Sequence, residues 1–330
     1  MKKQVALLGA TGPVGQRVIT MLENHPHFTL HEIAASDARV GQNFAESITW
    51  RNEIPMPTSV AKMKFRPLLE IESPYVISAL PTEVATEIEP LLAARGHYVF
   101  SNAASFRMDP LVPLMIPEIN SAHLSLLEKQ QTKGKIVTNP NCSTVFLAAA
   151  LAPLQELGTI EHVSAVTMQA LSGAGYPGVS AYDLMGNLIP HIGGEEAKIQ
   201  SETKKILGAA GIAANFGVTV HVHRVPVVHG HTVAAHVRFK EKVSIESVRS
   251  RFQAWADRSP NLFALHEEMD RPQPAKDLTP HEMRIHLGRF KQGDDPHTIG
   301  FISLGHNLVR GAAGAAIANM ESTLRHLGAI

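Results

Sequence analysis

Three evenly spaced glycines stand near the start of the chain, in the run Gly9-Ala10-Thr11-Gly12-Pro13-Val14-Gly15. An apolar strand pattern from Gln4 to Leu8 precedes this run, and a helix pattern from Pro13 to Asn24 follows it. Glycines at such a turn let the backbone approach a pyrophosphate, whose charge the helix N-terminus favours. The pattern predicts a dinucleotide-binding turn, with a purely structural tight turn as the alternative. The candidate cofactor contacts are Gly9, Thr11, Gly12, Pro13, Val14 and Gly15.

Strand and helix patterns continue to alternate through the first half of the chain. A strand pattern from Thr29 to Ala35 completes one βαβ unit. Further patterns lie at Tyr75 to Leu80, Glu83 to Arg95, Tyr98 to Asn102 and Ile136 to Asn139. This alternation predicts a mainly parallel sheet covered by helices, which is a Rossmann-type, doubly wound α/β domain.

The second half of the chain is dominated by strand patterns. They cover Ile160 to Leu171, Val218 to Val228, Thr232 to Lys240, Glu282 to Phe290 and Thr298 to Gly305. Few helix patterns separate them, so we expect an α+β domain with a mostly antiparallel sheet. The proline-rich stretch Ser259 to Pro280 is typical of a loop rather than of core. An alanine-rich helix pattern from Gly311 to Leu327 is expected to return to the first domain.

We therefore expect a dinucleotide-binding domain of residues 1–141 with 310–330, and a catalytic and dimerisation domain of residues 142–309. Hydrophobic residues make up 44% of the chain and charged residues 18%, which is enough to build a sizeable core. Lys plus Arg and Asp plus Glu both number 30, so no global field favours nucleic acid or an anionic membrane. One cysteine excludes an internal disulfide, and no apolar run reaches the ~18 residues of a membrane span. A cytoplasmic location is expected.

The segment after the second strand pattern is expected to contact the adenosine ribose. Ser36 and Arg39 suit a 2′-phosphate, whereas Asp37 suits a free 2′-hydroxyl. Because two of these three residues favour the phosphate, the sequence predicts NADP, with NAD as the alternative.

The single cysteine, Cys142, lies in Asn139-Pro140-Asn141-Cys142-Ser143-Thr144, where a strand pattern gives way to the helix pattern Val145 to Leu157. A thiol in the first turn of a helix meets unsatisfied N–H groups and the positive end of the helix dipole, which favour the thiolate. Cys142 is thus a candidate nucleophile. A buried cysteine that only packs is the alternative.

Four histidines lie close together in the chain, at His221, His223, His229 and His231. Such a set suggests a zinc site, since imidazoles bind zinc. Pro226 and Gly230 interrupt the strand between them, however, and no carboxylate or second cysteine has ligand spacing. We therefore expect no metal site.

Three motifs resemble those of the aspartate-semialdehyde dehydrogenase family. They are Asn139-Pro140-Asn141-Cys142-Ser143-Thr144, Gln169-Ala170-Leu171-Ser172-Gly173-Ala174-Gly175 and Arg224-Val225-Pro226-Val227-Val228-His229-Gly230-His231. The resemblance implies that Cys142 forms an acyl-thioester, that His231 is the general acid/base, and that Gln169 positions the substrate or thioester oxygen. Covalent attachment through sulfur divides a hard oxidation into feasible steps.

The resemblance also implies the substrates, aspartate 4-semialdehyde and 4-aspartyl phosphate, in the biosynthesis of lysine, threonine and methionine. It assigns the α-carboxylate to Arg224 and the α-ammonium to Glu195. It assigns phosphate to Arg107, Lys198 and Asn141, and further cofactor contacts to Ser172, Gly173 and Asn307. Helical spacing places Glu195 and Lys198 on one face, where an ordinary surface pair is the alternative.

Other functions stay open at this point. Sister reductases act on N-acetylglutamyl phosphate or on acyl-CoA thioesters, but an acetylated nitrogen offers no charge for Glu195. A non-catalytic paralogue and a zinc hydrolase are the remaining alternatives. Family members usually form homodimers or homotetramers.

Overall fold

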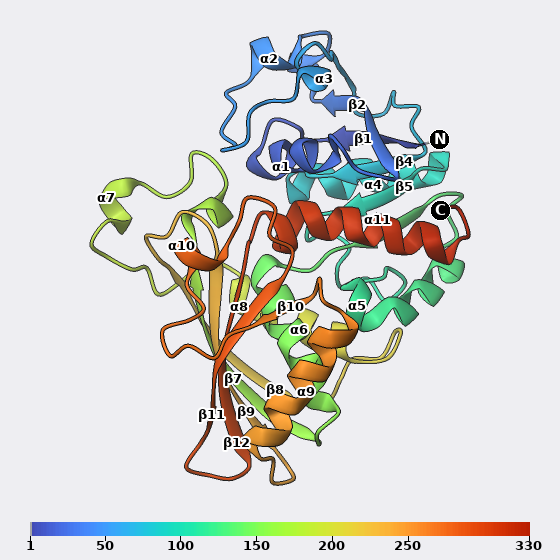
Figure 1. Cartoon of the computed structure of the whole chain (residues 1–330). Helices are drawn as coiled ribbons and strands as arrows, with labels where there is room; N and C mark the ends of the chain where they lie inside the picture. Colours follow the sequence, from blue (N-terminus) through green and yellow to red (C-terminus); the bar gives the residue numbers. More distant parts are fainter. Residues whose placement is uncertain (1) are drawn as a thin grey trace. The chain divides into compact units, whose positions relative to one another are not determined.

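The computed structural model describes residues 2–330, and the chain divides into two compact units (Figure 1). The first unit consists of residues up to Pro117 together with Ser121–Pro140 and Ala312–Ile330. The second unit consists of Glu118–Asn120 and Asn141–Gly311. Each unit has a six-stranded sheet of its own.

The sheet of the first unit is entirely parallel, with the strand order β3-β2-β1-β4-β5-β6. Its strands are β1 (Lys3–Leu8), β2 (Phe28–Ala35), β3 (Phe65–Pro67), β4 (Tyr75–Ser78), β5 (Tyr98–Ser101) and β6 (Lys135–Thr138). Its longer helices are α1 (Pro13–Leu22), α4 (Thr82–Arg95) and α11 (Gly314–His326). Short helical segments lie at α2 (Phe44–Ser47), α3 (Thr58–Ala61), η1 (Asp37–Arg39) and η2 (Ser121–Lys129), and α5 spans Pro117–Asn120.

Strand β1 shows why both faces of this sheet are covered. Val5 and Leu7 belong to an apolar cluster with residues of α1 and α11, whereas Ala6 and Leu8 belong to a second cluster with residues of α4. Successive strand residues point to opposite faces, so a continuous apolar run requires helices on both sides. Figure 1 shows α11, in red, running along this sheet. The predicted doubly wound domain is confirmed.

The sheet of the second unit is mixed, with the strand order β10-β11-β12-β9-β7-β8. Its strands are β7 (Ile160–Gln169), β8 (Gly217–Arg224), β9 (His231–Phe239), β10 (Phe263–Leu265), β11 (Ile285–Gln292) and β12 (Thr298–Gly305). Three of its five pairings are antiparallel and two are parallel. The predicted mostly antiparallel α+β domain is therefore confirmed.

Helices of the second unit pack against this sheet. They are α6 (Cys142–Gln155), α8 (Glu195–Leu207) and α9 (Ile245–Arg258), and they contact β9, β8 and β11 respectively (Figure 1). Short helical segments are α7 (Ala181–Leu184), α10 (Pro274–Asp277) and η3 (Leu171–Ala174), and a π-helical turn spans Val309–Ala313. Burial alternates along β7, where Val163, Ala165 and Thr167 are buried and the residues between them are exposed.

Some local expectations differ from the structure. Strand β8 ends at Arg224 rather than Val228, since Pro226 has no backbone N–H to donate. Helix α9 was not expected from the sequence, although Val248, Phe252 and Trp255 form a buried stripe at helical spacing. The stretch from Ser259 to Pro280 is also more ordered than a loop, because it contains β10 and α10. No helix within residues 2–330 is long and apolar enough to cross a membrane.

Candidate active site

Cys142 is the first residue of helix α6 and the second residue of the segment Asn141–Gly311, which belongs to the second unit. Asn141 caps this helix, and its Oδ1 accepts hydrogen bonds from the backbone N–H groups of Ser143 at 3.0 Å and Thr144 at 3.3 Å. The thiol therefore lies at the positive end of the α6 dipole. A side chain at Gly311 would place its Cβ 2.8 Å from Cβ of Cys142, so glycine is required for the chain to pass this residue.

Helix α8 directs two carboxylates toward the residue before the thiol. The Nδ2 group of Asn141 donates to Oε2 of Glu195 at 2.6 Å, and the backbone N–H of Asn141 donates to Oε2 of Glu202 at 2.6 Å. Nζ of Lys198 lies 3.2 Å from the other oxygen of Glu195. The structure thus brings Asn141, Glu195 and Lys198 together.

Glu202 was missed in the sequence analysis, although it is only 1% exposed. It follows Glu195 by seven residues, which is two helical turns, so both residues share one face of α8. That spacing was the available signal. Because Glu202 holds the backbone of Asn141, its role is to position the start of α6.

Arg224 is the last residue of β8 and is only 5% exposed. Its Nη1 donates to the backbone carbonyl of Ala170 at 2.6 Å. Burial lowers the pKa of Arg224, and the charges of Cys142 and Glu195 oppose this shift. A guanidinium held in this way is a fixed cation that suits an incoming carboxylate.

His231 is the first residue of β9 and is fully buried. Its Nδ1 accepts a hydrogen bond from the backbone N–H of Ala170 at 3.0 Å, and its ring meets the ring of Phe146 edge-on. Among the described residues, Nε2 of His231 has no hydrogen-bond partner. Burial, with a smaller contribution from Arg224, lowers the pKa of His231 to about 3. The ring is therefore neutral at physiological pH.

Two further predicted residues lie beside Arg224 and His231. A Cβ at Gly173 would lie 2.9 Å from Nη1 of Arg224 and 3.0 Å from Nε2 of His231, so the backbone of Gly173 closely approaches both side chains. Gln169 ends β7 and is 1% exposed, and its Nε2 has only a long hydrogen bond of 3.4 Å to Thr167. The Nε2 group of Gln169 is therefore only weakly hydrogen-bonded within the described part of the protein.

The remaining predicted contacts of the second unit, Ser172 and Asn307, bond directly to each other. Nδ2 of Asn307 donates to Oγ of Ser172 at 2.8 Å, and Oδ1 of Asn307 accepts from the N–H of Gly230 at 2.9 Å. The ring of His229 also contacts Oγ of Ser172 at 3.0 Å. These bonds fix the turn that leads into His231.

The glycine loop of the first unit has the geometry that a pyrophosphate requires. Gly9 has φ of +77°, and a Cβ at Gly15 would lie 2.3 Å from the carbonyl oxygen of Gly9, so both positions require glycine. A Cβ at Gly12, in contrast, meets no protein atom closer than 3.8 Å. Gly12 is the N-cap of α1 and Pro13 its first residue, so the space beside Gly12 faces a helix N-terminus. These residues fit a dinucleotide.

The other predicted residues of the first unit follow strand ends. Ser36 is exposed after β2, and Nη1 of Arg39 donates to the carbonyl of Ser47. Arg107 is 8% exposed, and its Nη2 donates to the carbonyl of Asn102 at 2.7 Å. Thr11 accepts from the amide of Gln16 through its carbonyl, and Val14 packs on the core around α1.

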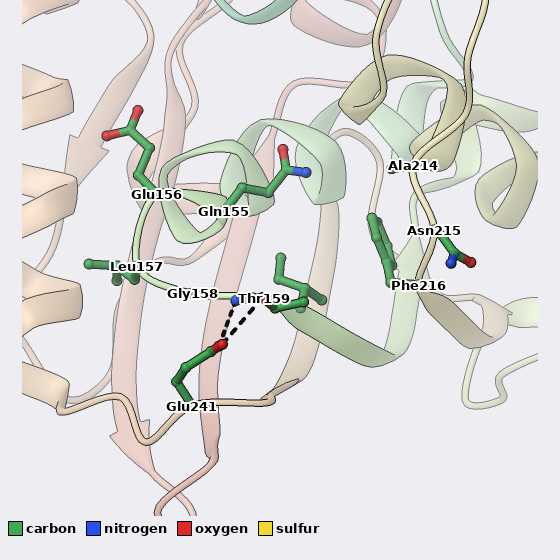
Figure 2. A pocket seen from close by; sticks show the side chains of 10 residues that line it. Gln155, Glu156, Leu157, Gly158, Thr159, Ala214, Asn215, Phe216 and Glu241 are labelled. Carbon is green, nitrogen blue, oxygen red and sulfur yellow. Dashed lines mark hydrogen bonds between the residues drawn. The ribbon is translucent and has the colours of Figure 1, made fainter.

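A pocket lies at the opposite end of α6 from the thiol. It has a volume of about 580 Å³ and is lined by residues such as Gln155, Glu156, Thr159 and Glu241 (Figure 2). Oε2 of Glu241 accepts from the N–H of Thr159 at 2.7 Å, and Glu156 is bonded to Arg251 and Trp255. Since α6 has 14 residues, this pocket is about 20 Å from the thiol. It contains none of the predicted site residues.

Comparisons with known proteins agree with these assignments of fold. The family model described as semialdehyde dehydrogenase, NAD binding domain, matches residues 4–127, and the model described as semialdehyde dehydrogenase, dimerisation domain, matches residues 151–310. An aspartate-semialdehyde dehydrogenase of Archaeoglobus fulgidus is 42% identical over 341 residues, which covers 98% of this chain and 99% of the relative. That of Methanothermobacter thermautotrophicus is 42% identical, with 96% and 97% covered.

Among solved structures, aspartate semialdehyde dehydrogenase with NADP from Candida albicans has a TM-score of 0.88 and 30% sequence identity to this chain. That match covers 99% of this chain and 100% of the other. The likeness therefore extends over both units and is not confined to one domain.

Proposed function

The chain belongs to the aspartate-semialdehyde dehydrogenase family, and we propose that Cys142 performs the covalent step of this family's reaction. The reaction is the reversible, NADP-dependent conversion of 4-aspartyl phosphate into aspartate 4-semialdehyde. The observation that carries the assignment is the start of α6, where the thiol stands beside Asn141, Glu195 and a buried Arg224.

The thiol is suited to nucleophilic attack. The α6 dipole and the guanidinium of Arg224 both favour the thiolate of Cys142. In the oxidative direction the sulfur adds to the aldehyde carbon, and loss of hydride from the adduct leaves a thioester. Phosphate then attacks the thioester carbon, and the thiolate leaves as 4-aspartyl phosphate forms. NADP, when bound, accepts the hydride in this direction and returns it in the other.

His231 acts on the oxygen of the substrate carbonyl. Because Nδ1 accepts from Ala170, the proton of the neutral ring is on Nε2, the atom without a partner among residues 2–330. An N–H in a dry site stabilises an oxyanion that forms on the carbonyl oxygen. For Nε2 to act as a base, the ring proton must first move to Nδ1, and this requires the hydrogen bond from Ala170 to break. The amide of Gln169 supports the same oxygen or the thioester.

The substrate's own charges are matched by Arg224 and Glu195. We propose that Arg224 binds the α-carboxylate and Glu195 the α-ammonium. The charges of Cys142 and Glu195 both act on Arg224, so the three groups belong to one site. A free ammonium is what Glu195 selects, and an N-acetylated substrate does not supply one.

Phosphate binding is assigned to Lys198, Asn141 and Arg107. Lys198 and Asn141 both contact Glu195, so a phosphate dianion at this place would find one ammonium group and one amide close together. Arg107, a buried guanidinium of the first unit, is assigned to phosphate from the family resemblance. These three assignments and the phosphate requirement are proposals.

NADP is the cofactor, in line with the match to an NAD-binding domain model and with the NADP-bound relative. The residues proposed to hold it are Gly9, Thr11, Gly12, Pro13, Val14 and Gly15 at the pyrophosphate, Ser36 and Arg39 at the ribose, and Ser172, Gly173 and Asn307 at the nicotinamide. The open space beside Gly12 supports the first set.

We further propose that residues 1–141 with 310–330 bind the dinucleotide, and that residues 142–309 carry catalysis and dimerisation. The dimerisation model that matches residues 151–310 supports a homodimer, and a homotetramer stays open. A cytoplasmic location, which the single thiol favours, stays a prediction.

The direct test is NADP-linked oxidation of aspartate semialdehyde with and without phosphate. We expect steady turnover of the wild type only when phosphate is present, and no turnover of Cys142→Ala. Multiple turnovers without phosphate, or a fully active Cys142→Ala variant, would contradict the proposal.

A further inference from the structure

Two histidines and an aspartate meet in the second unit, away from the residues assigned above. His266 follows β10, Asp277 ends α10, and His286 lies in β11. One nitrogen of each imidazole and one oxygen of Asp277 all lie within 4.8 Å of one another. Within residues 2–330 this is the only such group of three, and the four histidines between His221 and His231 do not form one.

The spacing of these atoms matches a small metal ion. Nε2 of His266 lies 3.0 Å from Nδ1 of His286 and 3.8 Å from Oδ1 of Asp277. A tetrahedral zinc ion with bonds of about 2.0–2.1 Å holds its ligand atoms about 3.3 Å apart. The three atoms are close enough for one such ion to bind all of them once the rings and the carboxylate adjust.

The second nitrogen of each imidazole ring lies near a glutamate carboxylate. Nδ1 of His266 lies 3.8 Å from Oε2 of Glu268, and Nε2 of His286 lies 3.9 Å from Oε2 of Glu282. Histidine ligands characteristically donate their second N–H to such a carboxylate, which fixes the tautomer and strengthens the ligand. At 3.8 and 3.9 Å these contacts are longer than hydrogen bonds, but each glutamate lies on the side of the ring where a carboxylate–histidine–metal triad has its carboxylate.

A hydrogen bond between two neutral imidazoles explains fewer features of this cluster than a bound metal ion does. It explains the contact of His266 with His286, and Arg271 explains the burial of Asp277, because its guanidinium pairs with that carboxylate. Within residues 2–330, Nε2 of His286 is buried without a hydrogen-bond partner, and Oε2 of Glu282 is 3.9 Å away from it. The hydrogen bond between the rings gives no reason for a glutamate near the second nitrogen of each ring.

The charges around the cluster permit a cation. The carboxylates are Glu268, Asp277 and Glu282, and the guanidiniums are Arg271 and Arg284. Three negative charges against two positive charges leave the neighbourhood negative before a metal ion enters. Imidazole and carboxylate ligands together suit zinc and related divalent ions better than calcium or magnesium.

We propose that His266, Asp277 and His286 bind a divalent transition-metal ion of the zinc class, with water completing the coordination. The ion ties together β10, α10 and β11, which no disulfide can do in a chain with one cysteine. This segment packs beside the active site, because a Cβ at Gly230 would lie 2.5 Å from Leu278 and 3.2 Å from Pro274. The metal thus supports the turn before His231, and the site differs from the sequence expectation of no metal.

The test uses the full-length protein after removal of metal with a chelator. Cobalt is titrated by its visible absorption, and zinc affinity is measured by competition with cobalt. We expect one equivalent per chain, with no thiolate charge-transfer band and with the same result in Cys142→Ser. His286→Gln and Asp277→Asn should weaken binding by at least about 100-fold, and Glu282→Gln by about 10-fold.

His221→Gln is the matched control, since it removes an exposed histidine elsewhere and should bind as the wild type does. No stoichiometric binding by the wild type would overturn the proposal, as would equal affinity in folded His286→Gln. If His286→Gln and Asp277→Asn do not fold, Glu282→Gln decides, and wild-type affinity in that variant would overturn the proposal.

Discussion

The backbone N–H of Ala170 donates a hydrogen bond to Nδ1 of His231 at 3.0 Å. An amide N–H can only donate, so this contact assigns the proton of the neutral imidazole to Nε2. The same residue, Ala170, accepts from Arg224 through its carbonyl. The backbone of Ala170 therefore orients two side chains. Arg224 is proposed to bind the substrate carboxylate, and His231 is proposed to act on the substrate carbonyl oxygen.

The buried position of His231 predicts how its ring titrates. Its pKa of about 3 lies below the ordinary 6.5, so the ring stays neutral from pH 5 upward and protonates only in strong acid. Nitrogen NMR of the histidines should show His231 protonated at Nε2 alone between pH 5 and 9. Replacement by Ala should lower kcat by about 10²–10⁴-fold. A His231 titration near pH 6.5 would contradict this account.

Glu195→Gln tests the proposed ammonium site. Loss of a charge-assisted contact costs about 1.5–3 kcal/mol, so kcat/KM should fall by roughly 10-fold to 100-fold. Glu196→Gln is the matched control, because that neighbouring side chain is 41% exposed and should leave kinetics unchanged. Equal kinetics for the two variants would remove Glu195 from the substrate site. Steady-state kinetics with aspartate semialdehyde measure both.

The glycine loop gives a prediction that separates binding from folding. Gly12→Ala places a methyl group in space that the protein leaves open, so the fold should be unchanged while NADP affinity falls at least about 10-fold. Gly15→Ala places its methyl 2.3 Å from the carbonyl oxygen of Gly9 and should destabilise the first unit by about 1–3 kcal/mol. Thermal unfolding and NADPH fluorescence titration distinguish the two. Unchanged affinity in Gly12→Ala would place the pyrophosphate elsewhere.

The burial of the Glu89 carboxyl group predicts that the free energy of unfolding depends on pH. Burial raises its pKa from 4.5 to about 7, so the folded state holds a proton that the unfolded state releases. Stability contributed by this group is present below pH 4.5 and is lost as pH rises through 7, by about 3 kcal/mol in total. Glu89→Gln should therefore be more stable than the wild type at pH 8 and similar at pH 5.

Urea unfolding at the two pH values measures this difference. Glu87→Gln, on the exposed face of the same helix, is the control and should behave as the wild type does at both. A Glu89→Gln variant that is less stable than the wild type at pH 8 would show that Glu89 is ionised and paired in the folded protein.

The features that the sequence predicts best are those set by local pattern. Continuous apolar runs such as Val5 to Leu8 identify strands buried on both faces, and the helix pattern from Val145 to Leu157 places Cys142 near a helix start, which the structure shows at Cys142 itself. The fold class and the family are confirmed. The roles of the individual site residues stay predictions.

Features that depend on distant contacts could not be read from the sequence. Glu202 matters because its carboxylate reaches the backbone of Asn141, 61 residues earlier in the chain. The group of His266, Asp277 and His286 is assembled by the pairing of β10 with β11, and β10 is only three residues long. Sequence spacing places Glu202 on the same face of α8 as Glu195 but does not identify Asn141 as its partner, and it carries no signal for the histidine–aspartate group.

The central claim is a thioester on Cys142, and a single-turnover experiment tests it most directly. The enzyme is mixed with aspartate semialdehyde and NADP without phosphate, NADPH formation is followed, and the protein is then analysed by mass spectrometry. We predict a burst of one NADPH per site and an aspartyl group on the peptide containing Cys142, both absent in Cys142→Ala. A burst without an adduct on Cys142, or the same burst in Cys142→Ala, would contradict the account.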